Sequence, residues 1–448
     1  MQQEHSQLTF SFLAPGKQVV ARFDGGQITS DAGLLPLKEF EHKIRYLDRI
    51  NQAITDPRQS AKVVHEQRTL LSQRLFGIIA GYEDCNDHQR LRHDPTFKVI
   101  TEQTDLTAPL AGQSTLCRLE NRIENADRSE LSDLLIDTYL ETKHKKKRAV
   151  VLDLDTSDDP CHGQQELSLF NAHYDNRIYL PLLIYEGHSG HLLKATLRTG
   201  KKTSGAEVVK ELTPVVDRLK TAKGGAKLSL RADAEFAAPK LYTYLEAQNI
   251  PYAIGIAGYA VFRQQAQQTL QSAQRAFEQT QKPQKRFGAF FHRAQSWKHK
   301  RRIVFKVEVT AQGQNLRFVI TSRRAKPKKV FAFYEQRGEC ENRIKELKNG
   351  FLADRLSCER FGSNCFRLLL HALAYNLHNL FRRAVNQSAQ IATTRWQLFK
   401  IGAYVEITTR RIWFHLSQSW PFADRFRTVC HAIAALPTLA SVGSFGPT

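Results

Sequence analysis

Two acidic residues stand at the ends of apolar segments that predict β-strands. Asp155 lies near the end of the alternating run Arg148 to Thr156 (RAVVLDLDT), and Asp233 ends the run KLSLRAD. The carboxyl ends of parallel strands lie at one edge of a sheet, so side chains at these ends are placed to form a site. Carboxylates are oxygen ligands that divalent cations such as Mg²⁺ prefer. The two acids therefore predict a cation-binding edge.

The segment Tyr334 to Lys348 (YEQRGECENRIKELK) carries a third carboxylate beside side chains that bind phosphate. At about 100° per residue, with Tyr334 at 0°, Arg337 falls near −60° and Glu341 near −20°. Lys348 falls near −40° by the same geometry. We therefore predict one helix that presents all four side chains on a narrow face. The neighbouring arc is apolar and predicts the packed face: Cys340, Ile344, Leu347 and Phe351.

Three carboxylates beside an arginine, a tyrosine and a lysine point to phosphoryl transfer. Three acids can hold two divalent cations about 4 Å apart, one to activate water and one to stabilise the leaving oxygen. The phenol, guanidinium and ammonium groups would bind the neighbouring phosphates. A surface ion pair between Arg337 and Glu341, four residues apart on a helix, is the alternative for these two side chains. Metal-dependent phosphoryl transfer on DNA is the reaction class that the combination predicts.

The elements around the first two acids predict an α/β core with a mixed sheet. Two apolar runs, Tyr179 to Ile184 and His191 to Leu197, flank the turn Glu186 to His191 and predict an antiparallel hairpin. The elements that follow are a helix capped by Ser204 and Glu207, a strand to Asp233, a helix over Ala238 to Gln248 and a strand over Pro251 to Ala257. This order of strands and helices is typical of an α/β layer structure.

Positive charge is concentrated between the second and third acids. The 448 residues include 65 Lys and Arg against 44 Asp and Glu, a net charge of +21. Residues 261–330 alone hold 17 of these bases and 2 of the acids. They follow a Gln-rich stretch, Gln264 to Gln284, that predicts a solvated helix or a linker, and Lys282 to Arg302 then mixes bases with aromatic residues. This mixture is typical of a surface that neutralises phosphates and stacks on bases, so we predict DNA contact. A solvated face over an aromatic core is the alternative.

Length and composition exclude several classes of protein. The length predicts two to four packing units rather than one small binding module. Met1 to Lys17 lacks a basic start followed by an apolar stretch, and no window reaches the roughly 18 apolar residues of a membrane span. Secretion and membrane insertion are therefore disfavoured. Seven scattered cysteines without a Cys-x-x-Cys pair argue against a disulfide scaffold or a zinc ribbon and favour a reducing cytoplasm.

Residues up to about 145 predict a mostly helical N-terminal domain. Within it, Gly81 to Pro95 (GYEDCNDHQRLRHDP) gathers acids and histidines, for which capping carboxylates between short helices are a commoner explanation than a metal site. Lys143 to Arg148 predicts a basic linker or helix end. Beyond Arg383 the tail carries Trp396, Trp413 and Trp420 without a catalytic pattern.

The same residues resemble a known family. Asp155 with Thr156, Asp233 and the pattern Tyr-x2-Arg-x3-Glu-x6-Lys resemble the DDE transposases of bacterial insertion sequences. Within these they resemble the branch with a Tyr-Arg-Glu-Lys signature helix, the insertion sequence 1380 family. The three acids are separated by 78 and 108 residues, and the longer separation leaves room for the β-rich insertion of that branch. Other segments that resemble the branch are Gly81 to Pro95, Ser114 to Arg122 and Leu368 to Leu377.

The resemblance implies a ribonuclease-H-like catalytic core with a mixed sheet, interrupted by a β-rich insertion and preceded by a helical DNA-binding domain. The implied domains are a DNA-end-binding domain over 1–145, a first part of the core over 146–258, a basic insertion over 259–329, a second part of the core over 330–385, and a C-terminal tail over 386–448 that is a candidate for dimerisation.

The resemblance also implies a role for each site residue. Asp155, Asp233 and Glu341 would hold two Mg²⁺ ions, for which Mn²⁺ can substitute. Asp153 shares a strand face with Asp155 and is the alternative ligand; Thr156, which follows Asp155, favours Asp155. Trp297 would stack on a flipped base or would belong to the core. Arg231 and Glu235 would support the site, and Asp158 and Asp159 would be loop acids. The implied DNA contacts are Tyr334, Arg337, Lys348, Trp297, Arg301 and Arg302.

The implied function is that of a DNA transposase. It would bind terminal inverted repeats, cut at the element end and transfer the released 3′ hydroxyl to the opposite strand or to target DNA. Two ends must be paired, which implies a homodimer, and the expected place is the bacterial cytoplasm, with the nucleoid and without a membrane partner. The alternatives are a structure-selective metal-dependent nuclease on the same core, and a non-enzymatic DNA-binding protein derived from a transposase.

Overall fold

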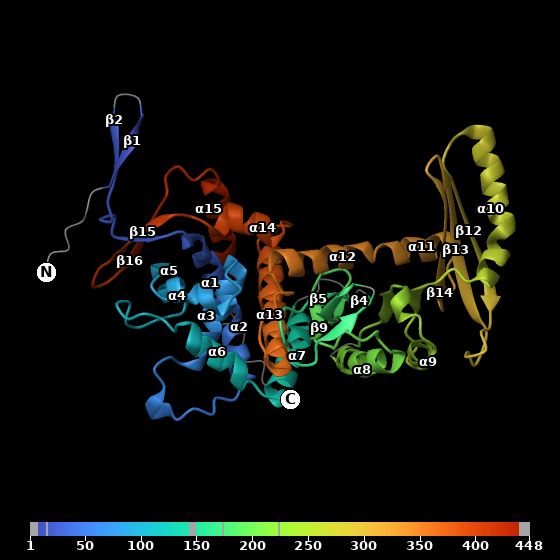
Figure 1. Ribbon diagram of the computed structural model, residues 1–448, viewed down its shortest axis with the longest axis horizontal. Helices are drawn as coiled ribbons and strands as arrows, with labels where there is room; N and C mark the ends of the chain where they lie inside the picture. The colour runs from blue at the N-terminus through green and yellow to red at the C-terminus, as the bar shows by residue number, and fades with distance from the viewer. Residues whose placement is uncertain (1–7, 15–16, 143–148, 173, 223–224, 439–448) are drawn as a thin grey trace. The chain divides into compact units, whose positions relative to one another are not determined.

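The computed structural model describes residues 8–14, 17–142, 149–172, 174–222 and 225–438. Contacts divide the chain into two compact units, which are shown together in Figure 1. The first unit consists of Met1–Arg122 and Leu377–Thr448, and the second consists of Ile123–Asn376. One long helix, α13 (Phe361–Ala384), contributes to both units. The predicted basic linker Lys143 to Arg148 lies outside the described residues.

The first unit is mostly helical, as predicted for the N-terminal part. Its central helix is α3, in which the apolar residues at helical spacing, Leu70 through Ile79, are buried. The C-terminal residues fold back into this unit, because strand β15 pairs with both β3 and β16. Its elements are β1 (Leu8–Ala14), β2 (Lys17–Ala21), β3 (Gln27–Thr29), α1 (Leu35–Ile44), α2 (Tyr46–Gln52), α3 (Gln67–Ala80), α4 (His88–Leu91), α5 (Pro95–Ile100), α6 (Gln113–Arg122), α14 (Ile391–Thr394), β15 (Ala403–Ile407), β16 (Ile412–Leu416) and α15 (Ala423–Ala434).

The acids in Gly81 to Pro95 cap short helices. Asp84 forms a capping box with Asp87 at the start of a 3₁₀ turn. The Asp94 carboxylate accepts a hydrogen bond of 3.0 Å from the backbone N–H of Phe97 at the start of α5. Carboxylates at these positions satisfy N–H groups that have no partner inside the helix. The prediction of capping carboxylates is therefore confirmed.

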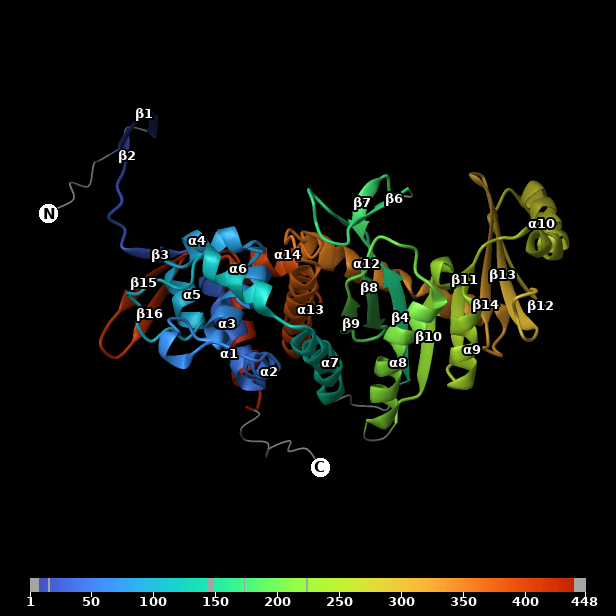
Figure 2. The same ribbon diagram turned by 60° about the horizontal axis from the view of Figure 1, so that its bottom comes forward.

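The second unit is built on one mixed eight-stranded sheet. Its strand order is β12-β13-β14-β11-β10-β4-β8-β9, which Figure 2 shows from right to left. The central strands β4, β10 and β11 are parallel, and the other pairs are antiparallel. The strands of the sheet are β4 (Val150–Thr156), β8 (Leu182–Glu186), β9 (Leu192–Thr196), β10 (Leu228–Ala232), β11 (Tyr252–Ile256), β12 (Gln284–His292), β13 (Arg301–Thr310) and β14 (Gly313–Thr321).

A small second sheet and further helical segments complete this unit. The predicted capping box is present, since the Ser204 hydroxyl accepts from the Glu207 N–H at 3.2 Å at the start of α8. The remaining elements are β5 (Asp159–Pro160), β6 (Leu169–Asn171), β7 (Asn176–Tyr179), α7 (Asn125–Glu141), α8 (Gly205–Thr221), α9 (Pro239–Ala247), α10 (Ala260–Thr280), α11 (Pro327–Glu335), α12 (Gly338–Lys345) and the π-helical turn Glu346–Gly350.

The two faces of the sheet differ in chemistry. Val150, Leu152 and Leu154 point into a core that α7, α8, α9 and α10 share. The intervening residues point to the face that α11 and α12 cover, where Val330 and Phe331 of α11 pack on Ala253 and Val319. Because side chains alternate along a strand, the alternation predicted for residues 148–156 places Asp153 and Asp155 on this second face.

The basic segment between the acids extends the central sheet. Residues 260–280 form α10, and the next three strands continue the hydrogen-bonded order from β11 through β14 and β13 to β12. The Gln-rich stretch is therefore helical through Thr280, and it is anchored because Phe262, Ala266 and Ala273 are buried against the sheet. The strands of the basic segment therefore belong to the same sheet as the strands that carry the first two acids.

The prediction of one regular helix from Tyr334 to Lys348 is wrong. Helix α11 ends at Glu335, α12 starts at Gly338, and a π-helical turn replaces the last predicted turn. At the break, the Cys340 N–H bonds to the Arg337 carbonyl at 2.8 Å, an i to i−3 bond in place of the α-helical one. Gly338 has high conformational freedom and a low helix propensity, which accounts for the interruption.

A buried ion pair under the second face should be critical for stability. Arg231 and Asp153 make two hydrogen bonds of 2.6 and 2.7 Å, and each side chain is 1% exposed. We expect Arg231→Met to lower the free energy of unfolding by about 3–5 kcal/mol, because it leaves a buried carboxylate without its partner. Urea unfolding would measure this loss. Adding Asp153→Leu to Arg231→Met should restore part of the lost free energy of unfolding. The control is Arg263→Met, at an exposed position on α10. Equal losses in Arg231→Met and Arg263→Met would contradict the expectation.

Candidate active site

The first two predicted acids lie at one edge of the central sheet. Strands β4 and β10 are parallel neighbours, with Arg231 beside Asp153 and Ala232 beside Leu154. Asp155 and Asp233 follow these paired residues, so both carboxylates stand at the carboxyl ends of adjacent strands. Asp233 also caps a short 3₁₀ turn, because its Oδ1 accepts from the Glu235 N–H at 2.9 Å. The strand-end argument from the sequence therefore predicted this arrangement correctly.

Arg337 joins the first and third acids. One guanidinium nitrogen donates to Asp155 Oδ2 at 2.7 Å, and the other donates to Glu341 Oε1 at 2.8 Å. The ion pair between Arg337 and Glu341, which the sequence left as an alternative, is thus present together with the contact to Asp155. A guanidinium stands between the two carboxylates in this structure.

Burial makes Asp155 unusually basic. Loss of water around this carboxyl is the largest effect, and it raises the pKa of Asp155 to about 7. Arg337 opposes the rise, whereas the negative charges of Asp233 and Glu341 add to it. The pKa of Asp233 is also raised, again mainly by burial. The carboxylates at this sheet edge therefore carry more negative charge than the Arg337 guanidinium neutralises.

Asp153 is engaged elsewhere. Both of its oxygens accept from Arg231, and Arg231 also donates to the Phe333 carbonyl and to the Gln336 side chain at 3.1 Å each. Both carboxylate oxygens of Asp153 are thus occupied by Arg231, while Asp155 lies two residues nearer the end of β4. This geometry favours Asp155 over Asp153 as a ligand.

Glu235 connects the site to a neighbouring loop. Its carboxylate accepts from the hydroxyls of Thr156 and Thr203 at 2.8 Å each. Arg231 and Glu235 thus have the supporting contacts expected of residues that flank Asp233. Thr203 was missed by sequence reasoning, since it lies in a loop without a motif and only the folded sheet brings it near Thr156.

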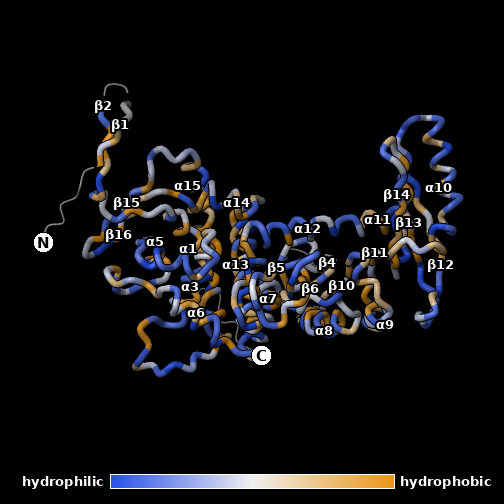
Figure 3. The backbone as a smooth tube through the Cα atoms, viewed as in Figure 1, coloured by the Kyte–Doolittle hydropathy of each residue, from blue (hydrophilic) through white to orange (hydrophobic). Residues whose placement is uncertain are grey.

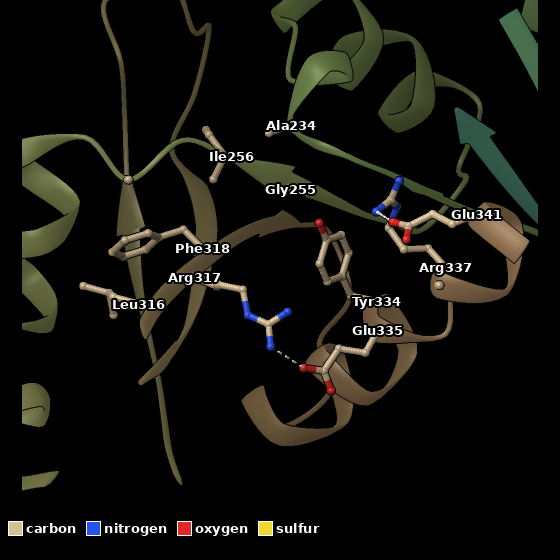
Figure 4. Close-up of a pocket in the computed structure, with 12 residues that line it drawn as sticks. Ala234, Gly255, Ile256, Leu316, Arg317, Phe318, Tyr334, Glu335, Arg337 and Glu341 are labelled. Atoms are coloured by element: carbon tan, nitrogen blue, oxygen red, sulfur yellow. Dashed lines mark hydrogen bonds and ion pairs between the residues drawn. The ribbon is translucent and has the colours of Figure 1, made fainter. Parts of the chain in front are cut away.

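A pocket of about 470 Å³ opens beside Arg337 and Glu341 (Figure 4). Tyr334 projects into it from α11, with its hydroxyl toward β11. Gly255 permits this approach, because a Cβ there would lie 2.7 Å from the Tyr334 hydroxyl oxygen. On the far wall the Arg317 guanidinium pairs with Glu335 at 3.1 Å. Three residues on this wall were not predicted as site residues, and all of them belong to β14: Leu316, Arg317 and Phe318.

Lys348 lies outside this pocket. Its ammonium donates to the backbone carbonyl of Asp158 at 2.6 Å and to its carboxylate at 3.0 Å. The structure therefore brings three of the four predicted helix side chains to the pocket and places the fourth against the loop after β4. Asp159, predicted as a loop acid, instead begins strand β5 and is buried, and burial raises its pKa well above the ordinary value.

Three predicted DNA contacts have partners inside the protein. Trp297 is 6% exposed and packs edge-on against Tyr242 and His292, so its burial favours the core alternative. Arg301 is 3% exposed and makes two hydrogen bonds of 2.8 Å to Glu246. The Arg302 guanidinium donates to two backbone carbonyls, those of Arg323 and Ala325, at 2.8 Å.

The donor set at the sheet edge suits a divalent cation. Asp155 and Asp233 are close enough for their charges to raise a pKa, and carboxylate oxygens are the ligands that Mg²⁺ prefers. Among the described residues no three His, Cys, Asp or Glu side chains converge as a ready metal cage. The reason at this edge is Arg337, which separates Glu341 from Asp155. The carboxylate oxygens of Asp155 and Asp233 are suitable donors for a cation, whereas Glu341 is paired with Arg337 in this structure.

The raised pKa of Asp155 predicts a pH dependence of stability. A carboxyl with a higher pKa in the folded state binds its proton more tightly there, so its stabilising effect is lost as the pH rises from about 4 to about 7. Without divalent metal, the free energy of unfolding of the wild type should therefore fall more steeply over this range than that of Asp155→Asn. Urea unfolding at several pH values measures this. Asp217→Asn, at an exposed position on α8, is the control, and parallel profiles for the wild type and Asp155→Asn would contradict the prediction.

Comparison with known proteins identifies the family of the chain. Within the described ranges, no helix combines the length and apolar character that crossing a membrane requires. No curated protein matches the chain. The family model described as Transposase DDE domain group 1 matches residues 13–438, nearly the whole chain. The chain therefore belongs to the DDE transposases, enzymes that cut and transfer DNA.

Proposed function

We propose that this transposase cuts DNA at terminal inverted repeats, and that Asp155, Asp233 and Glu341 hold the divalent cations for the reaction. The observation that carries this proposal is the pair of parallel strand ends, β4 and β10, that present the buried Asp155 and the partly buried Asp233 beside Arg337 and Glu341. Two Mg²⁺ ions, or Mn²⁺ in their place, fit the charge that accumulates there. A bound divalent cation supplies Lewis acidity toward the phosphate and lowers the pKa of water.

Arg337 has two roles in this proposal. Before cations bind, it neutralises Asp155 and Glu341. Once the carboxylates have other partners, its guanidinium is free to pair with a phosphate of the DNA end, for which its planar donors are well suited. The exposed side chain of Glu341, 51% accessible, is free to turn toward the strand ends when this exchange occurs.

Tyr334 orients the substrate. Its hydroxyl lies beside β11 in the pocket next to Asp233, and burial raises its pKa, so the phenol keeps its proton at neutral pH. A protonated phenol donates a hydrogen bond to a phosphate oxygen. Lys348, held at Asp158, contacts the backbone farther along the DNA. Cleavage releases a 3′ hydroxyl, which then attacks either the opposite strand or target DNA.

The basic segment 259–329 binds the DNA beside the catalytic edge. Helix α10 is mainly hydrophilic (Figure 3). One arc of its surface is exposed and lies on the side away from the face that packs on the sheet. At about 100° per residue the side chains of this arc span about 80° of the side opposite Phe262, and the exposed acid Glu278 lies at one end of the same side. Amide and guanidinium groups are the side chains that read base edges in the major groove. The residues of the arc are Gln264, Gln268, Gln271, Arg275 and Gln279.

Further parts of the proposal follow the family resemblance. The helical region 1–145 would bind the element ends, two protomers would pair the two ends, and the tail over 386–448 is the candidate for their contact. The chain would belong to the insertion sequence 1380 branch and act in the bacterial cytoplasm at the nucleoid. A structure-selective nuclease would use the same acids and metals but would not discriminate between end sequences.

Removal of any proposed ligand should abolish cleavage. We expect Asp155→Ala, Asp233→Ala and Glu341→Ala each to reduce Mg²⁺-dependent cleavage of DNA with the native element ends by at least about 100-fold, since loss of an outer-shell residue alone costs 10–100-fold. The measurement is strand cleavage under single-turnover conditions.

The matched control is Glu339→Ala. Glu339 is an exposed acid on the same helix as Glu341, two residues away and therefore on another side of α12. It should cleave like the wild type. Undiminished cleavage by all three ligand variants would refute the assignment. Equal cleavage of DNA with and without the terminal repeats would support the nuclease instead.

Arg275 offers a test of the DNA-binding arc that does not depend on catalysis. If this guanidinium contacts a phosphate, Arg275→Gln should weaken binding of end DNA and lower the slope of log affinity against log salt by about 1. Fluorescence anisotropy without divalent metal measures both. Lys227→Gln is the control, because this exposed lysine precedes β10 at the end of the strand opposite Asp233. Identical salt slopes for wild type and Arg275→Gln would exclude the contact.

A further inference from the structure

The three-stranded sheet of the first unit exposes an aromatic face. In its register Tyr404 of β15 lies between Ile28 of β3 and His415 of β16, and Trp413 lies opposite Glu406. Directly opposed residues in antiparallel strands share a face, so these side chains are neighbours on one surface. Ile28 is 62%, Tyr404 45% and Trp413 46% exposed, and the His415 side chain is 54% exposed. Large side chains with this degree of exposure form a continuous accessible surface.

The rings on this face lie nearly parallel. Tyr404 and His415 have centroids 5.8 Å apart with planes 25° from parallel, and His415 and Trp413 have centroids 6.4 Å apart with planes 20° from parallel. The Arg411 guanidinium lies over the Trp413 ring at 5.4 Å. The buried pair Phe40 and Phe381 in the same unit is instead edge-on, with planes 75° apart. The exposed rings are thus aligned in a row rather than interlocked.

Folding of the unit does not account for these aromatic residues. The opposite face of β15 is the packed one, with Ala403 4% and Val405 3% exposed. Gly26, with φ of 73°, lies so close to the Tyr404 ring that a Cβ would approach it to 2.7 Å, which fixes the ring against the backbone. The sheet is therefore anchored by one face and holds its aromatic residues in place on the other.

The charge around the row favours an anionic partner. Arg410 and Arg411 occupy the exposed turn between β15 and β16, next to Trp413. One acid, Glu406, belongs to the face, and its carboxylate lies 3.4 Å from His415 Nε2. Aromatic rings in a row beside guanidinium groups match a strand of unpaired nucleotides, whose bases stack on rings while its phosphates pair with cations.

We propose that the outer face of β3, β15 and β16 binds single-stranded DNA by stacking unpaired bases on Trp413, His415 and Tyr404. The choice of DNA over RNA rests on the proposed function, whereas the stacking site rests on the geometry of the face alone. Arg410 and Arg411 pair with the phosphates of the same strand. Cuts at different positions on the two strands of an element end leave unpaired nucleotides, and this face is a place to hold them.

The test measures binding of the full chain to an oligothymidylate of about 20 nucleotides, without divalent metal so that no cleavage occurs. We expect Trp413→Leu and Tyr404→Leu each to weaken binding about 5- to 100-fold, the range expected for loss of one stacked base. Trp413→Phe should retain most of the affinity, because it keeps an aromatic face. Trp396→Leu is the control, since Trp396 is 62% exposed but lies outside this sheet.

Each outcome decides the proposal. Loss of affinity in the leucine variants, with rescue by Trp413→Phe, supports stacking. Unchanged DNA affinity in both leucine variants overturns the stacking proposal. A leucine variant that changes the sedimentation of the free protein but not its DNA affinity also overturns it. The face would then be assigned to a protein contact. Preserved circular dichroism spectra exclude misfolding. Undiminished end cleavage by the ligand variants, which would refute the proposed catalytic site, would leave this binding result unaffected, so the two proposals fail separately.

Discussion

Compensation of buried carboxylates is the constraint on which the catalytic edge depends. Asp153 and Asp155 lie on the same face of β4, and neither is accessible enough to be solvated as a surface acid is. A buried charge needs a partner, and each carboxylate has a guanidinium. The two arginines differ in setting. Arg231 comes from a neighbouring strand and is 1% exposed, whereas Arg337 comes from the joint between two helices and is 15% exposed. One pair is almost fully buried, and the other is the pair that exchanges partners in the proposed function.

Patterns within a segment predicted the local structure well. The alternation in residues 148–156, the capping box at Ser204 and the order of strands and helices were all sufficient to place Asp155 and Asp233 at one edge of a mixed sheet. These features depend on neighbouring residues, and short-range physics determines them. The break at Gly338 was not predicted, because helical spacing alone does not reveal where hydrogen bonds change from i−4 to i−3.

Charge counts predicted less about individual residues. The excess of cations in residues 261–330 is real, yet Arg301 and Arg302 use their donors inside the protein, and Trp297 is in the core. A sequence shows how many cations a segment has but not which of them meet a carboxylate or carbonyl from a distant segment. Glu246, which binds Arg301, lies in a helix that precedes the basic segment. The side chains left over for a partner are those on exposed arcs such as that of α10.

Close packing at Gly255 has a consequence for related sequences. A methyl group at this position would collide with the Tyr334 hydroxyl and approach the backbone N–H of Ala234 at 3.0 Å, so the strand can carry no larger side chain while the tyrosine keeps its place. Steric contact therefore links the choice of residue at position 255 to that at position 334. Among relatives, a residue larger than glycine at 255 should occur together with a smaller residue than tyrosine at 334, and an alignment in which the two vary independently would indicate a different arrangement of the pocket in those proteins.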